Sequence, residues 1–205
     1  MRAAANKVRQ RHIASSAIAY DAFGLDTWRA SIASAPAAKA VLDDKMLGVE
    51  KLQSVFGAVR LLGGGADLAY ILQFVTSAAA LATLVVFVRQ PVTTLAKGAA
   101  MATAAALTSP YFLDYDLALV AIPLAWAASQ GMRTGFMPWE KSVLAFVFAL
   151  PAFSRVLAGL AHLPLAPVAL VLLYWCVVRR ATMEARRDFP QPFEISTAHA
   201  SGELA

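Results

Sequence analysis

The amino-acid sequence predicts an all-α fold: a polytopic membrane helical bundle of about five transmembrane helices, with an N-terminal amphipathic helical segment on its outer face. Composition is the first reason. Of the 205 residues, 59% are hydrophobic and 15% are charged, whereas a soluble domain has about 25% charged residues. The apolar residues also gather in runs. Lys and Arg lie in alternate gaps between these runs, which is typical of multi-pass membrane proteins.

Five apolar runs are the predicted transmembrane helices, and they define a domain over residues 66–180. The first run has the roughly 20 residues that a crossing needs. It ends at Arg89-Gln90-Pro91, because proline does not continue a helix interior. The second, third and fifth runs are shorter, so we expect their ends to shift by several residues. In chain order the runs cover about 66–88, 96–109, 117–128, 142–161 and 163–178.

The gaps between the runs differ in charge, and this difference predicts the orientation of the chain. Residues 110–116 and 162–164 contain no Lys or Arg. Cytoplasmic loops carry an excess of these residues, so we expect residues 110–116 on the outer side. The C-terminus, with a disordered tail over residues 181–205, is expected in the cytoplasm. The basic residues on the cytoplasmic side are Arg89, Lys97, Arg133, Lys141, Arg179, Arg180, Arg186 and Arg187.

Residues 1–65 precede the first run and are expected outside the membrane. Their apolar residues recur at helical spacing, which predicts short amphipathic helices separated at Pro36. These helices either lie on the outer leaflet or pack on another part of the same protein. Gly63-Gly64-Gly65 is expected to act as a hinge or helix break, and Asp67 to cap the first run. The apolar positions are Trp28, Ile32, Val41, Leu42, Met46, Val49, Leu52, Val55, Phe56 and Val59.

This orientation conflicts with the charge of the N-terminal segment. Residues 1–60 contain nine Lys or Arg and five Asp or Glu, and a basic segment at the start of a chain resists translocation. A preceding crossing would deliver the segment outward, and Ile13 to Leu25 look like the remnant of one, although Asp21 interrupts it. We therefore expect this chain to lack the N-terminal part of a longer protein.

The loop between the second and third runs is the first candidate site. It contains Tyr111, Asp114, Tyr115 and Asp116, and polar groups near membrane depth are costly and often functional. The carboxylates would bind a metal or sugar hydroxyls. In the alternative interpretation, one aspartate caps the third helix and the other is solvated, while the tyrosines lie in the aromatic belt of the interface.

Arg155 lies inside the fourth run, six residues before its end. Its guanidinium either snorkels to the outer surface or forms an anion site, and the planar fork of an arginine suits a pair of phosphate oxygens. In the second case Arg155 and His162 would line one outward-facing pocket. Residues at i, i+3 and i+4 share a helical face, and this one includes Phe148, Pro151, Arg155, Gly159 and His162.

Several classes of protein and site are excluded by composition. The net charge of +5 is divided among the gaps instead of forming one stripe, so we expect no nucleic-acid partner. Cys176 is the single cysteine, which excludes an intrachain disulfide and a cysteine-based zinc site. We interpret it as a small buried apolar residue.

Four sequence segments, taken in order, resemble the C-terminal half of bacterial glycosyltransferase family 87. The likeness extends over roughly residues 20–180, and these segments carry it: Gly24-x-x-x-Trp28, Lys51-Leu52-Gln53-Ser54-Val55-Phe56, Arg60-Leu61-Leu62-Gly63-Gly64, and Ser109-Pro110-Tyr111 with Tyr115-Asp116. The family consists of membrane-embedded enzymes with polyprenyl-phosphate sugar donors.

This resemblance implies a multi-pass enzyme of the bacterial inner (plasma) membrane that moves a hexose, typically mannose, to a lipid or glycan acceptor. Its partners would be membrane lipids, the polyprenyl-phosphate hexose donor and the acceptor, with no metal assigned. In this class the catalytic carboxylate usually lies in the first outward loop of the full protein, which has no counterpart here. We therefore expect the general base to be absent and the chain to be inactive alone. The expected substrate-binding residues are Tyr111, Asp114, Tyr115, Asp116, Arg155 and His162.

A second interpretation belongs to a different class, a small non-catalytic membrane protein that binds lipid or a membrane partner. A transporter is disfavoured, because the sequence has no visible inverted repeat.

Overall fold

The computed structural model describes residues 24–34, 36–37, 40 and 48–188. The chain divides into two compact units, Met1–Leu47 and Gly48–Ala205. In the first unit, residues 24–33 are helical and their side chains are exposed, including Trp28 and Ile32. Three positions of the predicted amphipathic pattern, at 41, 42 and 46, lie outside the described residues.

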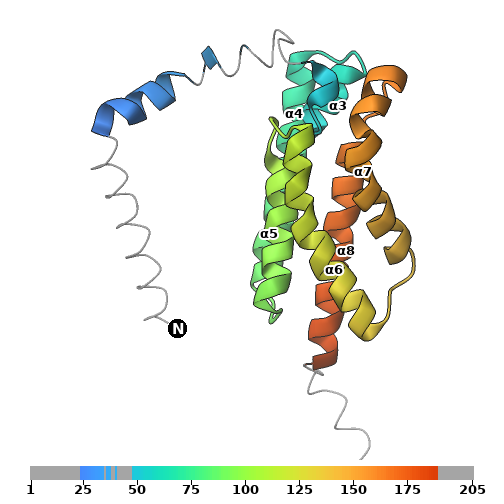
Figure 1. Ribbon diagram of the computed structural model, residues 1–205. Coiled ribbons are helices and arrows are strands. Elements are labelled where there is room, and N and C mark those ends of the chain that lie inside the picture. The colour runs from blue at the N-terminus through green and yellow to red at the C-terminus, as the bar shows by residue number, and fades with distance from the viewer. Residues whose placement is uncertain (1–23, 35, 38–39, 41–47, 189–205) are drawn as a thin grey trace, which may run out of the picture. The chain divides into compact units, whose positions relative to one another are not determined.

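The secondary-structure elements that the structure describes in the second unit are all helices, joined by loops (Figure 1). The prediction of an all-α fold is therefore confirmed. Among the residues that the structure describes, the one β-type pairing is an isolated bridge between Leu52 and Leu113. In order, the elements are η1 (Val49–Lys51), α3 (Val55–Leu61), α4 (Ala66–Val88), α5 (Thr94–Thr108), η2 (Asp114–Val120), α6 (Ala121–Thr134), α7 (Glu140–Ala161) and α8 (Leu165–Asp188).

Successive long helices of this unit run in opposite directions (Figure 1). The α4–α5 turn, the α6–α7 loop and the C-terminal end of α8 therefore share one end, which we call the basic end. Hydrogen bonds join these parts, for example from the hydroxyl of Thr182 to the side-chain oxygen of Gln90 at 3.3 Å. The opposite end, called the η2 end, brings together α3, η2 and the turn between α7 and α8. All the basic residues predicted on the cytoplasmic side belong to elements of the basic end.

Three helices are long and apolar enough to cross a membrane, namely α4, α7 and residues Leu165–Ala185 of α8. These helices indicate a membrane protein. The second and third predicted runs are also helical, but α5 and α6 contain only 15 and 14 residues. A 15-residue helix is about 22 Å long, short of the roughly 30 Å hydrocarbon core.

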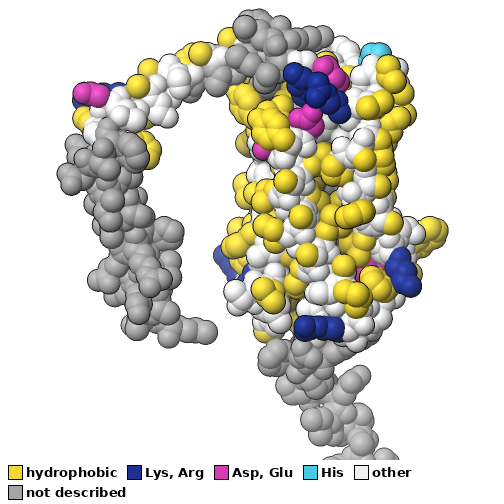
Figure 2. Space-filling model, viewed as in Figure 1, with side chains coloured by type: hydrophobic (Ala, Val, Ile, Leu, Met, Phe, Trp, Pro, Cys, Tyr) yellow, Lys and Arg dark blue, Asp and Glu magenta, His cyan; other side chains and the backbone are white. Residues whose placement is uncertain are grey.

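The short helix α5 is enclosed by its neighbours, since it packs against α4, α6 and α8. Its buried side chains are mostly small, which allows close approach of helices in membrane proteins. On the long helix α4 the large apolar side chains point outward instead, as Ile71, Phe74 and Val86 illustrate. Figure 2 shows this apolar surface over the sides of the bundle. The buried positions of α5 are Ala96, Ala99, Ala100, Thr103, Ala104, Ala106 and Leu107.

The structure differs from the predicted segments at three places. Helix α8 continues to Asp188, so the first residues of the predicted tail are helical, and residues 189–205 lie outside the described part. The N-cap of α4 is Gly65, and Asp67 lies in the first turn, where its charge still favours the helix dipole. Residues 48–65 belong to the same compact unit as the bundle, and their Leu52 and Phe56 are buried.

Two smaller predictions are confirmed. Gly63 has a φ of +88° between α3 and α4, a left-handed conformation that glycine adopts without strain, so the glycine run does break the helix. Cys176 of α8 is buried.

Candidate functional site

The loop of residues 109–113 is held by the segment that precedes α3. The backbone N–H of Gln53 donates to the carbonyl of Phe112 at 2.7 Å, and the Ser54 hydroxyl donates to the carbonyl of Pro110 at 2.7 Å. The same Ser54 oxygen accepts the N–H of Gly57 and so caps α3. These bonds give the backbone groups of a non-helical loop the hydrogen-bond partners that they need when buried.

A buried glutamine inside α4 completes the support of this loop. The Gln73 amide nitrogen donates to the carbonyl of Leu107 at 2.9 Å and to the hydroxyl of Ser77 at 3.2 Å. Its oxygen accepts the N–H of Phe56 at 3.0 Å. Gln73 therefore joins the last turn of α5 to the first turn of α3, and both segments adjoin the 109–113 loop.

The two aspartates of the loop have different roles. The Asp116 carboxylate accepts the N–H of Leu113 at 3.0 Å and so caps the start of η2. Asp114 accepts the N–H of Tyr115 at 3.0 Å through one oxygen. Its other oxygen lies 3.4 Å from a guanidinium nitrogen of Arg155. The interpretation that one aspartate caps a helix start therefore holds for Asp116. Asp114 instead forms an ion pair with Arg155 of α7.

Arg155 and its helical face lie on the surface of the unit. The side chain of Arg155 is 55% exposed and that of Asp114 is 25% exposed, so their ion pair is wet and weak, at about 0.2–1 kcal/mol. The predicted face exists, since Phe148, Pro151 and the other positions are all exposed. His162 is the C-cap of α7, in a left-handed conformation with a φ of 52°.

A groove of about 390 Å³ lies between η2, α6 and α7. We call it the η2–α7 groove. It is polar at one end only, where Asp114 and Tyr115 line it. Neither Arg155 nor His162 is part of its lining, and Arg155 reaches the groove only through Asp114. That Arg155 and His162 line one outward-facing pocket together therefore stays a prediction, since this groove is lined by neither. Apolar lining residues include Leu117, Val120, Leu124, Val147, Phe148 and Pro151.

The shape and charge of the groove suit an amphiphile. An apolar trough would take a hydrocarbon chain, and a half-exposed guanidinium at its polar end would take an anionic head group. Figure 2 shows basic and acidic side chains side by side at the η2 end, next to apolar surface. Tyr115 is 70% exposed at the same end, and Tyr111 is 37% exposed outside the groove lining.

The described residues contain no group of three His, Cys, Asp or Glu side chains that could hold a metal ion. Asp114 is the one carboxylate in the groove lining, and it is paired with Arg155.

A second polar cluster, at the basic end, was missed in the sequence. Arg180 of α8 and Glu140 of α7 form an ion pair although they are 3% and 1% exposed. Arg180 also donates to the Thr134 hydroxyl at 3.0 Å and to the Gly135 carbonyl at 2.9 Å. The position of Glu140 directly before an apolar run was the available signal, because a carboxylate there needs a partner.

No family model, curated protein or solved structure matches the chain in the three comparisons made with known proteins.

Proposed function

We propose that this chain forms part of an integral-membrane hexosyltransferase that takes its sugar from a polyprenyl phosphate. Among the hexoses, we propose mannose as the sugar that is transferred. The chain would cross the bacterial inner membrane five times, with the η2 end outside and the basic end in the cytoplasm. Two observations support the proposal. One is the resemblance of four segments, in order, to glycosyltransferase family 87. The other is the η2–α7 groove, which is the single structural observation that carries it.

A polyprenyl phosphate has the two parts that the groove is shaped to receive. Its isoprenoid chain would lie along apolar residues such as Leu124, Val147 and Phe148. Its phosphate would bind the guanidinium of Arg155, which in the free protein pairs with Asp114. When a phosphate takes the guanidinium, the Asp114 carboxylate becomes available to accept hydroxyl groups of the sugar.

The remaining predicted residues would support this arrangement in different ways. Asp116 would act indirectly, because its bond to the N–H of Leu113 holds the start of η2. The exposed ring of Tyr115 would cover the sugar. We place Tyr111 and His162 at the η2 end, at the entry for the acceptor.

Transfer itself requires a base. The acceptor oxygen attacks the anomeric carbon, the bond from that carbon to the phosphate oxygen breaks, and the polyprenyl phosphate leaves with the electron pair. A base takes the acceptor proton, which typically accelerates such a step about 10²–10⁴-fold. Since the Asp114 carboxylate, once the phosphate has displaced it from Arg155, would accept hydroxyl groups of the sugar, we propose that the base comes from outside this groove.

The binding step can be tested on the chain alone. The purified chain in lipid nanodiscs would be labelled with a photoreactive polyprenyl phosphate, and the labelled peptides would be mapped. We expect labelling within residues 114–124 and 147–151. Arg155→Ala should weaken labelling more than Arg155→Lys, because lysine keeps the charge but loses the fork. Lys51→Ala, which removes one charge in η1, is the matched control.

The contrary result is that a photoreactive polyprenol without phosphate labels the chain as strongly as the phosphate does, and that Arg155→Ala leaves this labelling unchanged. This result would contradict the assignment of Arg155 as the residue that binds the phosphate. In that case the groove binds an apolar chain and the guanidinium has no part in recognition.

A non-catalytic, lipid-binding membrane protein is the second candidate. The observation that favours it is the ion pair between Arg155 and Asp114, because Asp114 is the one carboxylate of the groove lining. Membranes from cells with and without the gene separate the two functions: gene-dependent transfer of a labelled hexose from polyprenyl phosphate supports the enzyme. Binding of the donor without gene-dependent transfer supports the lipid-binding protein.

A further inference from the structure

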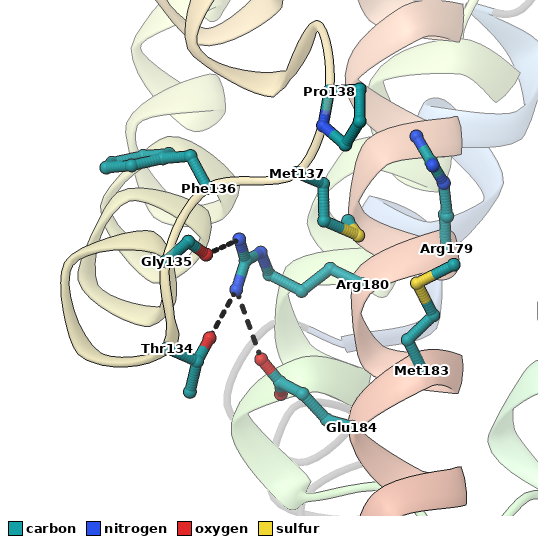
Figure 3. Close-up of a pocket in the computed structure, with 9 residues that line it drawn as sticks. All are labelled: Thr134, Gly135, Phe136, Met137, Pro138, Arg179, Arg180, Met183 and Glu184. Carbon is teal, nitrogen blue, oxygen red and sulfur yellow. Dashed lines mark hydrogen bonds and ion pairs between the residues drawn. The ribbon is translucent and has the colours of Figure 1, made fainter.

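A second cavity lies at the basic end, between the α6–α7 loop and the last turns of α8 (Figure 3). Its volume is about 310 Å³. Apolar side chains of the loop, among them Phe136 and Met137, form one side. Arg179, Arg180 and Met183 of α8 form the other. It is at the opposite end of the bundle from the η2–α7 groove and shares no residue with it.

Buried polar contacts hold this cavity open in a fixed shape. Arg180 bonds Thr134, Gly135 and Glu140, as described above. Figure 3 shows its guanidinium reaching from α8 to the loop. The Glu140 carboxylate also accepts the N–H of Met137 at 2.8 Å. Loop and helix are thus joined at several points, and the wall contains a charged side chain that is nearly fully buried.

The positive charge of this cavity exceeds the local negative charge. Both carboxylates nearby, Glu140 and Glu184, pair with Arg180. Arg179 has no carboxylate within ion-pairing distance among the residues that the structure describes. Its guanidinium lies instead over the ring of Trp175, 4.9 Å from the centroid. Lys141 adds a second cation, 5.0 Å from the ring centroid of Phe136.

An exposed apolar stripe begins at this cavity and follows α8 away from the basic end. Trp175 is half exposed. The residues one and two helical turns before it lie on the same face of α8. Exposed tryptophan next to arginine is typical of the boundary between hydrocarbon and head groups. The stripe consists of Val168, Val171, Leu172 and Trp175.

We propose that this cavity binds the phosphate of an anionic phospholipid, with Arg179 as the ligand-binding residue. The phosphate diester would take the guanidinium that has no carboxylate partner, and an acyl chain would lie along the stripe. A free phosphate offers the same chemistry to Arg179. The continuous apolar stripe favours the lipid, because a free anion would gain nothing from it. Basic pockets at the cytoplasmic ends of transmembrane helices suit such head groups.

The test measures lipid binding by the purified full chain with native mass spectrometry in detergent. The probes are a phosphatidylglycerol, a phosphatidylcholine with the same acyl chains, and inorganic phosphate. We expect Arg179→Gln to weaken phosphatidylglycerol binding about fivefold and to weaken phosphatidylcholine binding less, because the choline ammonium already offsets the charge of the same phosphate diester. Arg179→Lys should lose less. Arg89→Gln is the matched control, because Arg89 is an exposed cation of the same end outside this cavity.

Met183→Trp keeps every charge and narrows the cavity, so it should also weaken phosphatidylglycerol binding. Protection of the Cys176 thiol would verify that each variant is folded. Equal losses in Arg179→Gln and Arg89→Gln would overturn the proposal in favour of diffuse charge attraction. Displacement of phosphatidylglycerol by millimolar phosphate would overturn the lipid as ligand and assign a free-anion site. Neither outcome bears on the η2–α7 groove.

Discussion

Arg180 and Glu140 form a buried ion pair across 40 residues of sequence, from the last turns of α8 to the first turn of α7. The desolvation of two charges is costly, and such a pair adds little net stability relative to apolar residues of similar volume. Its value lies in the bonds from Arg180 to Thr134 and Gly135, which fix the α6–α7 loop.

Removing one partner of this pair should destabilise the protein strongly. Glu140→Ala leaves the buried guanidinium with only its longer contact to Glu184 at 3.4 Å, so we expect a loss near the lower end of the range of about 3–5 kcal/mol. Replacement of both partners, in Glu140→Leu with Arg180→Met, should cost less than the single change. The measurement is the thermal exposure of Cys176, the only cysteine of the chain, to a thiol-reactive dye. A double variant less stable than Glu140→Ala would show that the two charges are not coupled.

The buried amide of Gln73 should contribute to stability through its neighbours. Gln73→Leu leaves the N–H of Phe56 and the carbonyl of Leu107 without a partner, and each such group costs about 1–3 kcal/mol. The midpoint of Cys176 exposure should therefore fall. Thr76→Val is the control, because the exposed Thr76 hydroxyl bonds only within its own helix, and it should change the midpoint little. Equal shifts in the two variants would argue against the network.

Much of this architecture could be predicted from the sequence, and the reason is the length of the apolar runs. The run at 66–88 coincides with α4, because membrane thickness and the proline at 91 both limit it. The shorter apolar runs also correspond to helices in the structure, but the ends of these helices are displaced from the predicted ends. The third began at Leu117 in the sequence, whereas the helical turns begin at Asp114, as a 3₁₀ helix that propensity does not specify.

The candidate site could be predicted only in part. Spacing along α7 placed Arg155 and His162 on one helical face. Spacing does not say whether that face points into the bundle or away from it, and the structure places it on the surface of the bundle. The pairing of Asp114 with Arg155 joins elements 41 residues apart, and no local pattern contains it. Gln73 was overlooked because one polar residue barely changes the hydropathy of a run.

The orientation of the chain can be tested by cysteine labelling in a Cys176→Ala background. Tyr115 at the η2 end is exposed, and so is Trp139 in the α6–α7 loop. An impermeant maleimide added to intact cells should modify Tyr115→Cys, and it should modify Trp139→Cys only after permeabilisation. The reverse pattern would invert the proposed orientation and place the groove in the cytoplasm.

Asp114→Asn should tighten the binding of a polyprenyl phosphate that carries no sugar. The carboxylate competes with the phosphate for Arg155, and the amide competes less because it is uncharged. Stability should change by about 1 kcal/mol or less, since the pair is partly exposed, with 55% exposure at Arg155 and 25% at Asp114. Saturation of photolabelling gives the affinity, and Asp114→Asn with Arg155→Ala gives the baseline. Weaker binding in Asp114→Asn alone would mean that the carboxylate orients the guanidinium for the phosphate.

The last prediction concerns transfer. Vesicles that contain this chain as their only glycosyltransferase should bind the donor and transfer no hexose to a lipid acceptor. The groove lining offers a single carboxylate, Asp114, and in the proposed complex this carboxylate accepts hydroxyl groups of the sugar, so it is not placed to take the proton of the acceptor hydroxyl. A labelled hexose on polyprenyl phosphate, followed by extraction of lipids, measures the transfer. If transfer occurs and Asp114→Asn abolishes it while Asp116→Asn does not, then Asp114 is the base and its pairing with Arg155 is a resting state that the donor releases.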